Sequence, residues 1–121
     1  MEQKQEGAVY SVRDLCRLTG VTRKTLFYYD HKGLLKPTER KGPQSSKYYS
    51  SCDLFRLRKI LTWKRAGLEL QVISVLLEQE DSIPVELLEQ RLSQLKETQR
   101  QLVHSIRLLE QLIQQEQQVH P

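Results

Sequence analysis

The segment TRKTLFYYDHKGLL, residues 22–35, places side chains that bind polyanions on what reads as a short helix. Arg23 and Lys24 stand in the expected first turn, where positive charge opposes the helix dipole and acidic residues are favoured. Bases at these positions are expected when an external polyanion such as DNA supplies the negative charge, and Tyr28 is placed to donate its hydroxyl to a phosphate. The alternative is that Arg23 and Lys24 are solubilising surface charges without a ligand.

The histidines and cysteines predict no metal or catalytic site. His31, His104 and His120 are far apart in the sequence, and none stands near a cysteine at metal-ligand spacing. The sequence contains no GxSxG, P-loop or GxGxxG motif. Cys16 is expected to be a small buried thiol, whereas Cys52, in the expected first turn of a helix, leaves redox sensing open. We therefore expect a protein that is not an enzyme and that uses no cofactor or metal ion.

The charge is divided between the two halves of the chain. Residues 1–66 carry 15 Lys and Arg against 6 Asp and Glu, a balance of +9, whereas residues 67–121 carry 4 against 9, a balance of −5. The N-terminal half is therefore suited to a polyanion, and the C-terminal half is not. No apolar run approaches the roughly 18 residues that a membrane span needs, and the N-terminus lacks the apolar core of a signal peptide. These features predict a cytoplasmic protein without membrane contact.

Two short helices are predicted near the start of the chain. Ser11 and Asp14 form a capping-box pattern at the start of the first helix, and Gly20 is expected to end it with a tight turn. Thr22 is a favourable N-cap for the second helix, which Gly33 is placed to end. Two short helices joined by a glycine-containing turn form a helix-turn-helix, whose second helix enters the major groove of DNA.

The following segment, residues 36–49, contains two prolines, a glycine and a Tyr-Tyr pair, and it predicts a short β-hairpin. The hairpin carries Arg40 and Lys47, so it adds a second basic element to the helix-turn-helix, as a wing would. Apolar spacing then predicts two further helices, over residues 50–66 and 70–77.

The last segment predicts a long helix from Pro84 to about Gln118, with Pro84 in its first turn and Ser82 available as a cap. Its seam alternates spacings of four and three, which is typical of heptad a and d positions. The seam residues are Leu88, Leu92, Leu95, Gln99, Leu102, Ile106, Leu109 and Ile113. The helix runs for about 50 Å at about 1.5 Å per residue, and no other predicted helix is long enough to cover the seam. We therefore expect a homodimer, in which a second copy of the chain covers it.

The stretches YSVRDLCRLTGVTRKTLFYYDHKGLLKP and DLFRLRKILTWKRAGLELQVISVLL, followed by the coiled-coil helix, resemble the MerR family of bacterial transcription regulators. The resemblance covers about residues 9–78. It implies a mainly α fold, with a winged helix-turn-helix DNA-binding domain at residues 9–80 whose wing is a small β-hairpin. It also implies a coiled-coil dimerisation helix at residues 82–118, paired antiparallel with its copy, and flexible tails at residues 1–8 and 119–121.

The resemblance also implies a function and a mechanism. A homodimer of this family binds double-stranded DNA in a sequence-specific manner, at a pseudo-palindromic promoter whose spacer between the elements read by RNA polymerase is overlong. Activators of the family bend and untwist that spacer, so that RNA polymerase engages both elements.

The family's DNA-contacting positions fall on five side chains of the second helix and the hairpin: Arg23, Lys24, Tyr28, Arg40 and Lys47. The chain departs from the family pattern at Phe27, where a basic residue is usual. Ser46 and Lys47 replace the usual Tyr-Arg pair of the wing, and the hairpin loop is slightly longer. Lysine keeps the charge of arginine but lacks its bidentate donor geometry.

Neither of the family's two familiar sensors is recognised in the sequence. Metal-sensing members carry cysteines around and after the long helix, and here there is none beyond Cys52; drug-sensing members append a ligand domain, and here the sequence stops soon after the helix. Regulation is then expected through concentration, a partner protein or a small ligand at the dimer seam.

Two other classes of function are open. One is a protein-binding modulator that has kept the winged-helix fold, as chaperone-modulating relatives of the family have. The other is a small-molecule-binding protein, which has little support because no pocket-forming domain is visible. The basic N-terminal half and the bases at the start of the second helix favour DNA binding, since a protein that binds only proteins does not need them.

Overall fold

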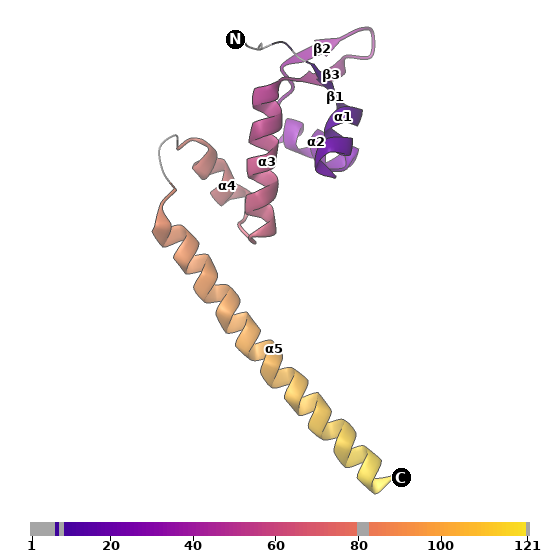
Figure 1. Cartoon of the computed structure of the whole chain (residues 1–121), viewed down its shortest axis with the longest axis vertical. Coiled ribbons are helices and arrows are strands. Elements are labelled where there is room, and N and C mark those ends of the chain that lie inside the picture. Colours follow the sequence, from indigo (N-terminus) through magenta and orange to yellow (C-terminus); the bar gives the residue numbers. More distant parts are fainter. Residues whose placement is uncertain (1–6, 8, 80–82, 121) are drawn as a thin grey trace. The chain divides into compact units, whose positions relative to one another are not determined.

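The computed structural model describes residues 7, 9–79 and 83–120, and the chain divides between residues 80 and 81 into two compact units. In chain order the elements are β1 (Tyr10–Ser11), α1 (Val12–Thr19), α2 (Arg23–His31), β2 (Glu39–Lys41), β3 (Ser46–Tyr49), α3 (Ser51–Arg65), α4 (Leu70–Leu77) and α5 (Val85–Val119) (Figure 1). All of them except α5 belong to the first unit. The expected mainly helical fold, with a small sheet and a long C-terminal helix, is confirmed.

Hydrogen bonds at the helix ends define α1 and α2 as the predicted helix-turn-helix. In the capping box of α1, the Asp14 amide donates to Ser11 Oγ at 3.1 Å and the Ser11 amide donates to Asp14 Oδ2 at 2.9 Å. Gly20 ends α1 with a φ of 80°, a left-handed conformation that glycine adopts without steric cost. Thr22 caps α2 by accepting the Thr25 amide at 3.1 Å. Because these caps satisfy amides that a first turn leaves unpaired, both helices begin where the sequence predicts.

The second helix ends at the predicted glycine. Lys32 is its C-cap, and Gly33 follows with a φ of 77°. The Leu34 amide then donates back to the Tyr29 carbonyl at 2.9 Å, as in a Schellman turn. This turn directs Leu34 and Leu35 into the interior, where they are 6% and 1% exposed.

Apolar side chains from helices α1 to α4 form the core of the first unit, together with Leu35 of the loop after α2 and one tyrosine of the sheet. The largest completely buried side chains are Leu15, Leu26, Leu35, Tyr49, Leu57, Ile60, Ile73 and Leu76. Within α2, Leu26, Tyr29 and Asp30 are buried. The opposite face of α2 therefore points outward, and its side chains are available to a ligand.

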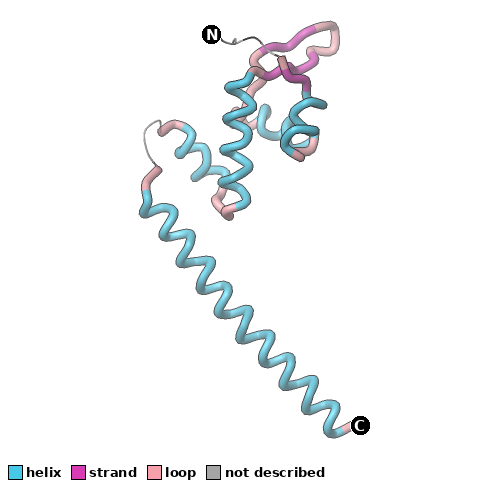
Figure 2. Tube along the Cα trace, viewed as in Figure 1, coloured by secondary structure: helices cyan, strands magenta, loops and turns pink. Residues whose placement is uncertain are grey.

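The predicted hairpin is present, and it belongs to a three-stranded antiparallel sheet. Strands β2 and β3 pair with Arg40 opposite Lys47. Strand β1, which the sequence did not predict, pairs with the other edge of β3, with Tyr10 opposite Tyr49, so the strand order is β1-β3-β2. The strands are drawn in magenta in Figure 2. A strand of two residues is too short to show an alternating pattern. Because β1 runs directly into α1, it ties the wing to the helix-turn-helix.

The two remaining helices of the first unit pack against each other. A second capping box starts α3: the Asp53 amide donates to Ser50 Oγ at 3.1 Å, and the Ser50 amide donates to Asp53 Oδ2 at 2.9 Å. Gly67, with a φ of 86°, ends α3 as predicted. Helix α4 contacts α3 and buries Ile73 and Leu76.

The second unit is a single helix, α5, of 35 residues. At about 1.5 Å per residue it is about 52 Å long. Pro84, which was predicted to lie in the first turn, is instead the N-cap residue and precedes the helix. The reason is its backbone conformation, with a φ of −61° and an extended ψ of 115°. The expected cap Ser82 and most of residues 1–8 lie outside the described residues, whereas Val119 is the last residue of α5. None of the helices in residues 9–79 and 83–120 is long and apolar enough to cross a membrane.

Candidate nucleic-acid interface

The first turn of α2 exposes two bases. Arg23 and Lys24 are both exposed, and this turn contains no acidic residue. Within the described part of the chain, no carboxylate forms an ion pair with either side chain. Their charge adds to the positive end of the helix dipole. An anion at this end of α2 is therefore attracted by both side chains and by the amides of the first turn.

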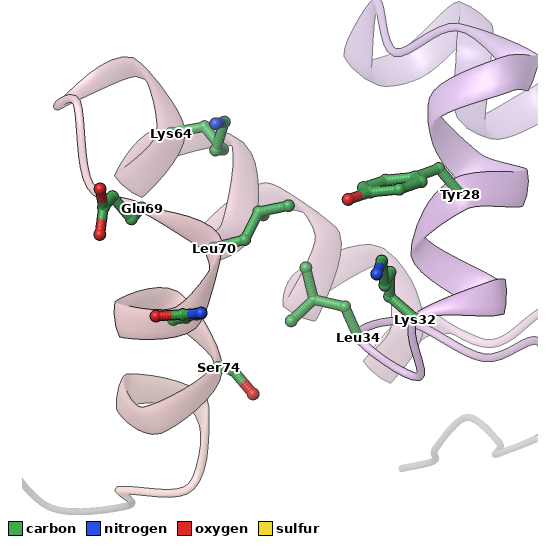
Figure 3. Close-up of a pocket in the computed structure, with 8 residues that line it drawn as sticks. Tyr28, Lys32, Leu34, Lys64, Glu69, Leu70 and Ser74 are labelled. Carbon is green, nitrogen blue, oxygen red and sulfur yellow. The ribbon is translucent and has the colours of Figure 1, made fainter.

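Tyr28 lies further along α2 and is 45% exposed. It lines a cleft of about 780 Å³ between α2 and the α3–α4 pair, where it points across towards Leu70 (Figure 3). The Lys32 ammonium lies 5.7 Å from the centroid of the Tyr28 ring. The remaining lining residues are Leu34, Lys64, Glu69, Gln71 and Ser74. With two lysines and a phenol hydroxyl on its walls, the cleft continues the basic surface of α2 towards α3.

The bases of the wing meet a buried carboxylate. Asp30, in the last turn of α2, is only 7% exposed. Arg40 Nη2 donates to both of its oxygens, at 3.0 Å to Oδ1 and 3.1 Å to Oδ2. Lys47 Nζ lies 3.6 Å from Oδ2, and Lys36 Nζ lies 3.8 Å from Oδ1. Two of the five side chains predicted to contact DNA, Arg40 and Lys47, are therefore also bound to a carboxylate of the protein itself.

The charges around Asp30 keep it ionised. Burial disfavours its charged form, but the hydrogen bond from Arg40 and the charges of Arg40, Lys47 and Lys36 outweigh that effect, so the pKa of Asp30 lies below its ordinary value. The same hydrogen bond raises the pKa of the Arg40 guanidinium. Sequence reasoning missed Asp30, although its place four residues after the buried Leu26, on the inner side of α2, was a usable signal.

The two bases of the wing differ in exposure. The Arg40 side chain is 45% exposed, whereas that of Lys47 is 22% exposed. Lys47 is covered on a second side by Phe27 of α2, because its ammonium lies 4.1 Å from the centroid of the Phe27 ring. Such a cation–π contact joins the wing to the outer face of α2. Arg40 thus keeps more of its surface for an external ligand, and Lys47 is mostly engaged within the protein.

A second cleft, of about 530 Å³, separates α2 from the wing. Its walls include Arg23 and Phe27 of α2, Lys47 of the wing and Arg13 of α1. Arg23 and Lys47, far apart in the sequence, are therefore brought to one basic surface, while Tyr28 lines the other cleft. Arg13 is an exposed base that sequence reasoning did not single out.

The predicted seam of α5 is exposed in the single chain. Its apolar members range from 38% exposed at Leu88 to 59% at Leu109, and Gln99 is exposed as well. Between Leu88 and Ile113, three further exposed apolar side chains lie outside the a and d positions: Val103, Leu108 and Leu112 are 41%, 46% and 58% exposed. The heptad spacing alone did not identify them. Helix α5 therefore carries a broad, exposed apolar surface.

The thiols and histidines form no recognisable metal centre. Cys16 and Cys52 are free; Cys16 is half-buried instead of buried as expected, because it stands on the flank of α1, and Cys52 is exposed. Among the residues that the structure describes, no three His, Cys, Asp or Glu side chains are grouped so that they could hold a metal ion.

A helix-turn-helix with a basic first turn, a basic wing beside it and a long apolar-faced helix is the architecture of a winged-helix regulatory protein. The model of the MerR HTH family regulatory proteins matches residues 10–80, more than half of the sequence. The chain belongs to this family, whose members are transcription regulators and not enzymes.

Known proteins resemble the chain over different lengths. The transcriptional activator TipA of Streptomyces coelicolor is 41% identical over 69 residues, which are 57% of this chain and 27% of TipA. The chain thus spans about a quarter of the length of the curated relatives it matches. The N-terminal part of the multidrug transporter activator Mta from Bacillus subtilis, MtaN, superposes with a TM-score of 0.73 at 26% identity, over 87% of this chain and 98% of MtaN. EcmrR, solved as a DNA complex in an RNA polymerase open complex, superposes with a TM-score of 0.79 over 90% of this chain and 40% of its own; at 22% identity this likeness concerns the fold alone.

Proposed function

We propose that this chain is a sequence-specific, DNA-binding transcription regulator that acts as a homodimer on a pseudo-palindromic promoter. The observation that carries the proposal is the exposed first turn of α2, where Arg23 and Lys24 face outward with no carboxylate partner among the described residues. In a helix-turn-helix, the N-terminal residues of the second helix approach the base edges of the major groove. Positive charge there reduces the stability of the helix and is explained by a polyanionic ligand.

The proposed contacts to DNA are of three kinds: to base edges, to phosphates and to the methyl group of thymine. Arg23 and Lys24 are assigned to base edges and phosphates at the start of α2, and Tyr28 donates its hydroxyl to a phosphate. Arg40, the more exposed base of the wing, contacts the backbone beside the groove. Phe27 presents an apolar ring on the same face, which suits contact with the methyl group of thymine. Lys47 contributes charge to this surface while it holds Phe27.

Dimerisation is assigned to α5, and DNA binding to residues 9–80. The seam from Leu88 to Ile113 consists of seven apolar residues and Gln99, all exposed in the single chain. Pairing with a second copy, at residues 82–118, covers the seam and sets the distance between the two copies of α2. Each protomer then contacts one half-site of an inverted repeat.

The mechanism follows from the likeness to activators of this family. Bound across an overlong promoter spacer, the dimer bends and untwists the DNA, which brings the two promoter elements into a register that RNA polymerase can use. EcmrR, which shares the fold, has been solved together with DNA and RNA polymerase, and this supports RNA polymerase as a partner. Such a regulator acts in the cytoplasm, where bacterial promoters are.

The second candidate is a protein-binding modulator with the same fold. The broad apolar surface of α5, with Leu108 and Leu112 outside the seam, is the observation that favours it. The two functions differ in what the bases of α2 are for: a modulator that binds only proteins keeps its activity when Arg23 and Lys24 are both replaced by glutamine.

Selection of duplexes from a random DNA pool by the purified protein tests the proposal. We expect enrichment of an inverted repeat with two equal half-sites, and loss of the enrichment in a protein with Arg23→Gln and Lys24→Gln. A pool that stays unenriched while the protein binds polymerase or another protein would favour the modulator.

A further inference from the structure

Two positive charges repel each other across the wing hairpin, and the carboxylate that offsets this repulsion belongs to α2. Arg40 and Lys47 stand directly opposite each other on β2 and β3. Like charges in register across an antiparallel pair destabilise it. Both cations reach the same carboxylate on α2, Asp30, at 3.0 Å from Arg40 Nη2 and 3.6 Å from Lys47 Nζ. The attraction that offsets the repulsion therefore comes from another element of the fold.

Cationic side chains from three places along the chain lie within 3.8 Å of the Asp30 carboxylate. In addition to the wing bases, Lys36 of the loop after α2 places its ammonium 3.8 Å from the carboxylate and donates to the Asp30 carbonyl at 3.3 Å. The carboxylate is buried and the guanidinium of Arg40 spans both of its oxygens. One side chain thus joins the end of α2, the following loop and both strands of the hairpin.

Lys47 extends this link to the outer face of α2. Its ammonium lies between Asp30, at 3.6 Å, and the ring of Phe27, at 4.1 Å from the centroid. Asp30 and Phe27 are three residues apart and therefore neighbours on one side of α2, so a single lysine of β3 is held there by a carboxylate and an aromatic ring. The hairpin is therefore positioned against α2 by charge and by an aromatic ring together.

We infer that Asp30 is a positioning residue for DNA recognition: its carboxylate sets the wing against the second helix so that the bases of both reach one duplex. This inference rests on the proposed function. Asp30 itself, being buried on the inner side of α2, is not placed to touch DNA. Its effect on DNA binding is exerted through Arg40 and Lys47.

Replacement of Asp30 by asparagine distinguishes the effect of wing positioning on DNA binding from the effect of net charge. Asp30→Asn keeps the shape of the side chain and makes the DNA-binding unit more positive by one charge. If net charge alone mattered, binding would become tighter for every duplex. We expect the opposite for the selected duplex: binding weakens by about tenfold or more, roughly the value of one base contact. Binding to a scrambled duplex of the same length stays equal or tightens, so the specificity ratio falls.

Glu39→Gln is the matched control. Glu39 is an exposed carboxylate on β2 of the same hairpin, and its ion pair is with Lys41 at 3.7 Å. Its removal changes the net charge by the same amount without touching the Asp30 contacts. We expect tighter binding to both duplexes and an unchanged specificity ratio. The idea is overturned when Asp30→Asn behaves as Glu39→Gln does.

A second variant covers the case in which Asp30→Asn fails to fold. Arg40→Gln removes the closest cation from a side chain that is 45% exposed, and thermal melting checks that the variant is folded at the temperature of the binding assay. Loss of the specificity ratio supports positioning through the Asp30 contact, whereas an equal loss on both duplexes marks Arg40 as a phosphate contact only and contradicts it. If the unmodified protein does not distinguish the two duplexes, the proposed function itself fails, which is a separate outcome.

Discussion

Truncation of one leucine in the α5 seam, Leu102→Ala, tests the dimer on which the proposed function depends. Leu102 is 58% exposed in the single chain. Complete burial of a leucine side chain contributes about 1.5–3 kcal/mol, so covering the exposed part contributes about 1–1.7 kcal/mol. Two-fold symmetry places the substitution in the interface twice, and the dimer is expected to lose about 2–3.4 kcal/mol. At about 1.4 kcal/mol per factor of ten, the dimer dissociation constant rises about 30- to 270-fold.

Sedimentation equilibrium over a dilution series measures that constant. The control is Gln111→Ala, an exposed position on the same helix nine residues further on, about two and a half turns away and thus on the opposite face. Both substitutions introduce the strongest helix former, so neither weakens the helix itself, and circular dichroism checks its content. Equal dissociation constants for Leu102→Ala and Gln111→Ala would refute the seam as the dimer interface.

Three further predictions concern single side chains. Arg23→Ala is expected to weaken binding to the selected duplex by about 1–3 kcal/mol and to relax the base preference at one position in each half-site. Affinities for a panel of duplexes with single-base changes test this. An equal loss of affinity across the panel would mean that Arg23 contacts only phosphate. Phe27→Ala is expected to remove the penalty for replacing one thymine of the half-site by uracil, which lacks the methyl group; a wild-type protein that is indifferent to uracil at every position would show that the ring reads no methyl. Tyr49→Phe is expected to leave the free energy of unfolding unchanged or raise it by about 1 kcal/mol, because a buried hydroxyl without a partner is costly. Among the described residues the Tyr49 hydroxyl has no hydrogen-bond partner, and its burial raises its pKa to about 12; a loss of more than about 1 kcal/mol in urea denaturation would mean that the hydroxyl is satisfied in solution.

Local signals in the sequence were sufficient for most of the fold. The two capping boxes, at Ser11 and Ser50, and the glycine that follows α2, Gly33, act within a few residues of the chain. Physical chemistry at that range depends little on tertiary context, so these features were predictable. Strand β1 was not predictable, because its two residues form a strand only through pairing with β3.

The candidate interface was less predictable than the fold, because part of it depends on tertiary contacts between residues that are distant in the sequence. The bases of α2 were identified because their place in a helix follows from the N-cap, Thr22. The partners of Arg40 and Lys47 were not identified, since their contacts with Asp30 join residues 10 and 17 positions apart through the folded core. Only the structure shows that the Arg40 side chain is more exposed than that of Lys47.

The central claim, that this chain recognises a DNA sequence, is tested most directly by the salt dependence of its affinity for two duplexes. The selected duplex and a scrambled duplex of equal length and composition are titrated with the protein at several salt concentrations. We expect the selected duplex to bind about a thousandfold or more tightly. We also expect affinity for both duplexes to fall steeply with salt, because each phosphate that a cation neutralises contributes about 0.9 to the logarithmic slope. A ratio close to one, or binding that salt does not weaken, would contradict the account.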